Sequence, residues 1–71
     1  MIDARGMRCP WPALRLARAL RERPEAVELL ADDPAAEREC GAVAGAAGYR
    51  FSVSETGRYL ASINTSFTLD A

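Results

Sequence analysis

The chain has 71 residues and a mass of 7.7 kDa, enough for one small domain that buries only about 60% of its unfolded surface. Hydrophobic residues make up 49% and charged residues 27%, which argues against a disordered chain, and no stretch approaches the roughly 18 apolar residues of a membrane span. The chain has no histidine and only two cysteines, which argues against a structural zinc site and against a secreted disulfide framework.

Charge is distributed unevenly along the sequence. Residues 1–23 hold six arginines and two acids, a net charge of +4, whereas residues 24–71 hold three arginines and eight acids, a net charge of −5. All nine basic residues are arginine, a bias that genomic base composition alone could produce, and the lack of lysine excludes a Schiff-base lysine mechanism. The overall charge of −1 makes general nucleic-acid binding unfavourable.

The N-terminal half predicts a strand, a loop and a helix. Residues 2–5 alternate in polarity as a short strand does, and Gly6 ends it. A helix is expected from Pro10 or Pro12 to Glu22, because proline is well suited to the first turn. Its apolar side chains fall within one arc and predict the buried face: Ala13, Leu16, Ala17 and Leu20.

The second half predicts a strand, a helix and a hairpin. Residues 26–31 read as a strand, and a helix should follow to Ala47, with Asp33 as its N-cap and Pro34 in its first position. Two strands, 49–54 and 59–67, are joined by a turn in which Gly57 supplies a positive φ.

The expected order is therefore β-α-β-α-β-β. Amphipathic helices and half-polar strands require two layers, and right-handed crossovers place both helices on one face. We expect an α/β (α+β) two-layer sandwich with a four-stranded mixed sheet and two helices on one face.

Cys9 is the only strong nucleophile in an informative position. It lies just before a proline-led helix, near Arg5 and Arg8, where a thiolate could be stabilised and the thiol pKa lowered from its usual 8.5 or so. The alternative is a loop cysteine without a role. There is no Cys-x-x-Cys pair and no histidine base, so dithiol exchange and papain-type catalysis are excluded. A lone thiolate can still relay sulfur as a persulfide.

Other candidate residues each have two interpretations. Trp11 is either an exposed anchor for a partner or a lid on the core. Arg15 and Arg18 form either a solvated helix face or a landing site for an acidic partner. Cys40 is expected to be a small buried side chain, and a redox role as a resolving thiol for Cys9 cannot be derived from sequence.

The segment Asp3-Ala4-Arg5-Gly6-Met7-Arg8-Cys9-Pro10-Trp11-Pro12 resembles the opening of the TusA/SirA-type sulfur-carrier family, whose signature is Gly-x-x-Cys-Pro-x-Pro. Ala31-Asp32-Asp33-Pro34-Ala35 resembles the second family marker. The resemblance spans nearly the whole chain and implies one sulfur-carrier domain over residues 1–71, with a β-α-β-α-β-β sandwich.

The resemblance also implies a chemistry and its residues. Cys9 would carry a persulfide from a cysteine desulfurase or rhodanese-like donor to an acceptor protein, with no cofactor beyond that covalent sulfur and no metal. Gly6, Pro10 and Pro12 match the signature, and Cys9 is the expected nucleophile. The residues expected to stabilise its thiolate or persulfide are Arg5, Arg8, Pro10 and Pro12. The residues expected to dock partners are Trp11, Arg15 and Arg18.

Trp11 departs from the family, because members in tRNA thiolation tend to carry an acid between the two prolines. Two other functions compete with sulfur transfer. One is a redox-sensing or regulatory protein-binding module of the same fold. The other is an RNA-binding module, although this sequence shows no exposed aromatic pair of the kind that stacks bases. Because the N-terminus lacks an apolar signal core, we expect a cytoplasmic protein. We also expect no membrane partner and no direct nucleic-acid binding.

Overall fold

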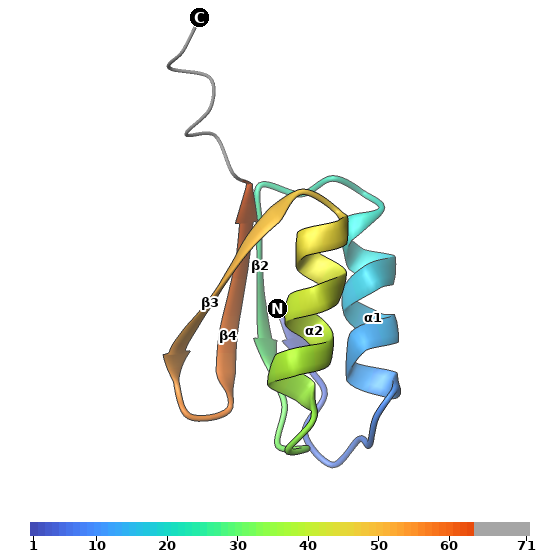
Figure 1. Ribbon diagram of the computed structural model, residues 1–71, viewed down its shortest axis with the longest axis vertical. Helices are drawn as coiled ribbons and strands as arrows, with labels where there is room; N and C mark the ends of the chain where they lie inside the picture. The colour runs from blue at the N-terminus through green and yellow to red at the C-terminus, as the bar shows by residue number, and fades with distance from the viewer. Residues whose placement is uncertain (64–71) are drawn as a thin grey trace, which may run out of the picture.

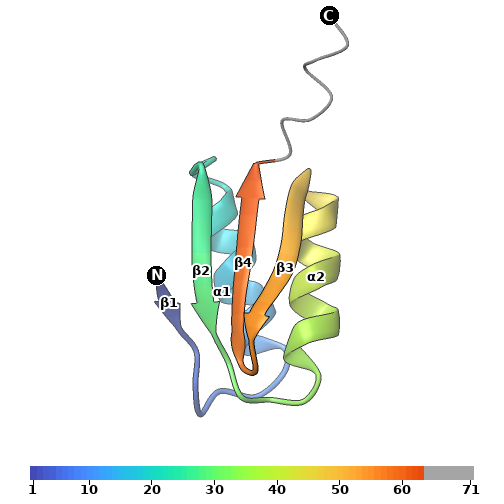
Figure 2. The ribbon, with the colours of Figure 1, turned by 90° about the vertical axis from the view of Figure 1, so that its left-hand side faces the viewer.

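The computed structural model, in which residues 1–63 are described, is a two-layer α+β sandwich. The elements follow the order β1 (Ile2–Asp3), α1 (Trp11–Leu20), β2 (Ala26–Leu30), α2 (Ala36–Ala46), β3 (Tyr49–Glu55) and β4 (Arg58–Ile63). Both helices lie side by side on one face of the sheet (Figures 1 and 2), and the other face is open. The predicted order and fold are therefore confirmed, although the predicted strand residues 64–67 lie outside the described range.

The sheet has the order β1-β2-β4-β3 and is mixed. β1 pairs in parallel with β2, and β2 and β3 both pair antiparallel with β4. The cross-strand pairs Val27↔Ala61 and Leu29↔Tyr59 place buried side chains opposite each other beneath the helices. On the open face, Arg58 reaches Glu28 at 3.2 Å.

The core is built from side chains that alternate along the strands and recur once per turn in the helices. In α1 the buried positions are Pro12, Ala13, Leu16 and Leu20, whereas Ala17 is only partly buried. In α2 they are Ala36, Cys40 and Ala44, spaced four residues apart. These small residues let α2 approach the sheet closely, and a Cβ at Gly41 would already lie 3.4 Å from the Phe51 ring.

Element boundaries shift by about two residues from the sequence-based expectation. α1 ends at Leu20 rather than Glu22, and Arg23 takes a φ of 54° ahead of Pro24. α2 begins at Ala36 rather than Pro34, yet Asp33 Oδ1 still accepts a hydrogen bond from the Ala35 N–H at 2.8 Å. The N-cap of α2 is Ala35, which has no side-chain cap hydrogen bond, so the predicted N-cap at Asp33 is wrong. Asp33 instead stabilises the turn that precedes the helix.

Three connections meet at one end of the molecule. The β1–α1 loop, the β2–α2 loop and the β3–β4 hairpin all lie at the lower end in Figure 1. Gly57 lies in the hairpin, and its carbonyl oxygen accepts a hydrogen bond from the Ala31 N–H at 3.0 Å. This contact ties the hairpin to the end of β2.

Replacing Gly57 with alanine is expected to destabilise the fold by about 1–2 kcal/mol, because its φ is +78° and a Cβ would lie 3.1 Å from the Ala31 carbonyl oxygen. Gly45 is the matched control, since nothing lies within 4 Å of a Cβ there and Gly45→Ala should stabilise α2 by roughly 1 kcal/mol. Urea unfolding of both variants gives the two free energies. Equal effects of the same sign would contradict this account.

Candidate functional site

Cys9 lies in the β1–α1 loop, directly before the start of α1. Its side chain is exposed, and Pro10 follows as the N-cap residue. The loop begins at Gly6, whose φ of 84° turns the chain away from β1. Pro12 lies in the first turn of α1, and its buried side chain packs this turn against the core. The signature residues thus present the sulfur at the surface from a loop anchored on both sides.

Two aspartates of the β2–α2 loop hold the Cys9 loop in place. Asp32 accepts the Gly6 N–H with both carboxylate oxygens, at 3.0 and 3.2 Å. Asp33 Oδ2 accepts the Cys9 N–H at 3.2 Å while its Oδ1 binds Ala35. These bonds join segments more than 20 residues apart and give the Asp32-Asp33 pair a structural role in the site. The sequence predicted only the cap of α2 at Asp33.

The Cys9 sulfur is hydrogen-bonded to a glutamate of α2. Its Sγ donates to Glu39 Oε1 at 2.8 Å, across 30 residues of sequence. This hydrogen bond, followed by desolvation and by the charges of Glu39 and Asp33, raises the pKa of the Cys9 thiol from its ordinary value, while Arg38 acts in the opposite direction. These groups therefore favour the protonated form of the resting sulfur.

The expectation of a lowered thiol pKa is wrong for the resting protein, and the geometry gives the reason. Arg5 is engaged elsewhere, since its Nε and Nη2 bind Asp3 at 2.9 and 2.8 Å, and this pairing lowers the pKa of Asp3 to about 2. Pro10 and Pro12 have no N–H to offer an anion, and the Trp11 N–H donates to the Arg8 carbonyl at 2.8 Å. Arg8 is exposed beside Cys9, and its role stays a prediction.

The predicted docking residues share the outer surface of α1. Trp11 is 59% exposed and lies two residues from Cys9. Arg15 and Arg18 follow at helical spacing, both exposed, and an Arg15 Nη1 lies 3.9 Å from the Met7 sulfur. Leu14, which the sequence analysis did not select, is also 51% exposed on this helix. Trp11 is therefore not a lid on the core, and its role as an anchor for a partner stays a prediction.

Cys40 is completely buried on the inner face of α2, as expected for a small core residue. Burial is the main cause that raises the pKa of its thiol to about 11. At neutral pH such a thiol is a poor nucleophile, so among residues 1–63 the accessible thiol is that of Cys9.

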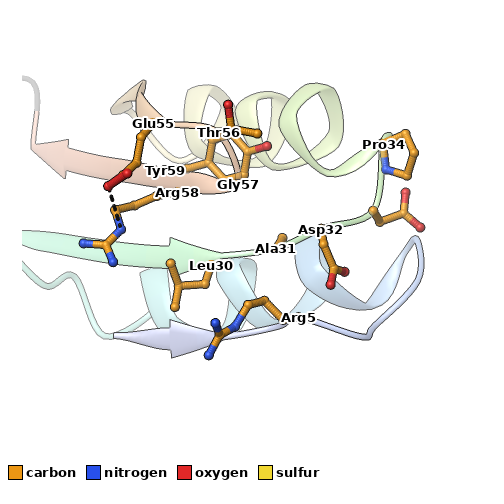
Figure 3. Close-up of a pocket in the computed structure, with 11 residues that line it drawn as sticks. Arg5, Leu30, Ala31, Asp32, Pro34, Glu55, Thr56, Gly57, Arg58 and Tyr59 are labelled. Carbon is orange, nitrogen blue, oxygen red and sulfur yellow. Dashed lines mark ion pairs between the residues drawn. The ribbon is translucent and has the colours of Figure 1, made fainter.

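An open cleft of about 500 Å³ lies at the same end of the molecule. Arg5 and Asp32 line one side of it and the β3–β4 hairpin the other, with Arg58 paired to Glu55 (Figure 3). Cys9 does not line this cleft, whereas Arg5, Asp32 and Asp33 do. The Cys9 side chain is itself exposed, so a second protein can reach its sulfur.

The fold and site define a small α+β domain that presents one exposed cysteine ahead of a Pro-x-Pro helix start. The family model described as Sulfurtransferase TusA matches residues 1–64. The chain belongs to this family, which supports a sulfur-carrier role in general terms. Comparisons with curated proteins and with solved structures gave no match. Among residues 1–63, no helix has the length and apolar character needed to cross a membrane.

Proposed function

We propose that the protein is a persulfide carrier that accepts sulfur on Cys9 and passes it to a thiol of an acceptor protein. The exposed position of the Cys9 sulfur at the start of α1, within a chain of the TusA family, is the observation that carries this proposal. An exposed sulfur suits such a task, because the partner supplies the other half of the site.

Loading requires only thiol chemistry. Cys9 loses its proton, and its thiolate attacks the outer sulfur of a donor persulfide R–S–SH. The donor S–S bond breaks, a new S–S bond forms on Cys9, and R–S⁻ leaves and takes up a proton. The products are Cys9–S–SH and R–SH, so no external oxidant or reductant is consumed.

Delivery repeats the same exchange in the other direction. An acceptor thiolate attacks the outer sulfur of Cys9–S–SH, which forms the acceptor persulfide and returns Cys9 as a thiolate that is then protonated. We place donor and acceptor docking on the outer face of α1, where Trp11, Arg15 and Arg18 combine an aromatic anchor with positive charge. The sulfur donor is a cysteine desulfurase or a rhodanese-like protein. The cytoplasmic location of the protein remains a prediction.

The proposal is tested by incubating the chain with a cysteine desulfurase and free cysteine, followed by intact-mass measurement. We expect a gain of one sulfur atom that a reducing thiol removes. A sample without desulfurase controls for sulfur carried by free cysteine. A chain that gains no sulfur from a desulfurase or from a rhodanese-like donor would instead fit the regulatory-module interpretation, and the carrier proposal would be rejected.

A further inference from the structure

Cys9 and Glu39 make a direct side-chain contact that sulfur transfer itself does not require. Glu39 lies in the first turn of α2, three residues after Ala36, and it is half-buried. The Sγ···Oε1 distance of 2.8 Å joins the two groups directly. A carboxylate can only accept a hydrogen bond, so this contact exists only while the sulfur carries its proton.

We propose that Glu39 is a positioning residue that fixes the direction of the Cys9 sulfur and holds it as an unreactive thiol until a partner docks. The inference rests on the proposed persulfide carrier, and it concerns the state of Cys9 before sulfur is accepted. A resting thiol is protected from oxidation and from unspecific alkylation, since both follow thiolate character.

The charges around the sulfur support this role. Two carboxylates, Glu39 and Asp33, face Cys9 from α2 and from the β2–α2 loop, and Arg38 is the cation that opposes them. Neither Arg5, which is bound to Asp3, nor the proline-led start of α1 offsets these carboxylates. The local field therefore favours the protonated sulfur, in contrast to the positive net charge of residues 1–23.

The same contact distinguishes the unloaded from the loaded protein. A persulfide anion on Cys9 has no proton to donate, so its outer sulfur is repelled by the Glu39 carboxylate and turns toward solvent. Glu39 thus orders the thiol when the carrier is empty and directs the transferable sulfur outward when the carrier is full. Docking of a cationic partner group on Glu39 would release the thiol for attack.

The decisive variant is Glu39→Gln, which keeps the size of the side chain and removes its charge. The rate of Cys9 alkylation by iodoacetamide is measured from pH 6 to pH 10, and the midpoint reports the thiol pKa. We expect the variant to be alkylated about fivefold faster at pH 7.5 and to show a lower midpoint, as expected when one charge in contact with an exposed thiol is removed.

Glu37→Gln is the matched control, because Glu37 also lies in the first turn of α2 but makes no hydrogen bond to Cys9. Its alkylation profile should equal that of the wild type. An unchanged or slower rate in Glu39→Gln would overturn the inference, as would an equal acceleration in both variants, which would indicate an unspecific charge effect.

Sulfur loading of the same variants, followed by intact mass, separates this inference from the carrier proposal. If the wild type takes up sulfur but Glu39→Gln has a wild-type alkylation profile, the role of Glu39 fails and the carrier proposal stands. If no variant takes up sulfur, the carrier proposal fails, and a shifted profile would still assign control of the thiol to Glu39.

Discussion

Replacing Cys9 with serine is expected to abolish sulfur loading completely while leaving the fold unchanged. A serine hydroxyl is not ionised at neutral pH and cannot form a persulfide, whereas the exposed sulfur of Cys9 can. The fold should persist to within about 0.5 kcal/mol, because the side chain is exposed and the Cys9 N–H bond to Asp33 is made by the backbone.

Cys40→Ala is the matched control for that experiment. Cys40 is fully buried and its thiol pKa is raised to about 11, so its removal should leave the loading of Cys9 intact. Intact mass after incubation with a cysteine desulfurase and cysteine reports both results. A sulfur adduct on Cys9→Ser equal to that of the wild type would refute Cys9 as the carrier.

The largest loss of stability is expected for Leu16→Ala. Leu16 is completely buried between α1 and the sheet, and truncation of such a leucine typically costs about 3–5 kcal/mol. A domain of this size has a total stability of roughly 4–10 kcal/mol, so the variant should lose a large part of it and unfold at a lower temperature. Thermal unfolding followed by circular dichroism measures the loss.

Leu14→Ala provides the matched comparison, because the same substitution is made on the same helix at a side chain that is 51% exposed. Its effect should remain within about 0.5 kcal/mol. A similar loss of stability in both variants would mean that α1 packs through a different face than the structure shows.

Much of the fold was predictable because its signals are local. The alternation of Tyr49 and Phe51, the glycine at the hairpin and the apolar arc of α1 each depend on residues close in sequence. Val53 shows the limit of this pattern. It follows the same alternation but is 47% exposed, since it lies near the hairpin end of the edge strand β3.

The nucleophile of the site was predictable, but its electrostatic environment was not. Cys9, Pro10 and Pro12 form a contiguous motif, whereas the groups that set the state of the sulfur come from α2 and the loop before it. Glu39 lies 30 residues from Cys9, and sequence spacing carries no signal for such a contact. The acids in the first turn of α2, Glu37 and Glu39, were not predicted as part of the site.

Arg5 also shows that proximity in sequence does not predict the electrostatic environment of Cys9. Its proximity to Cys9 in sequence suggested that it stabilises a thiolate, but Asp3 lies two residues away in the other direction and captures its guanidinium at 2.8 Å. In the folded chain the closest opposite charge decides the pairing of an exposed arginine. Net charge over residues 1–23 therefore predicted the wrong local field at the sulfur.

The most direct test of the sulfur-carrier account locates the transferred sulfur by peptide mass mapping. Cleavage after the arginines places Cys9 in residues 9–15 and Cys40 in residues 39–50, so each thiol is read separately. The wild-type chain is loaded by a cysteine desulfurase, its thiols are blocked by alkylation, and the fragments are weighed. The account predicts one additional sulfur on residues 9–15 and none on residues 39–50, and an additional sulfur found only on residues 39–50 would contradict it.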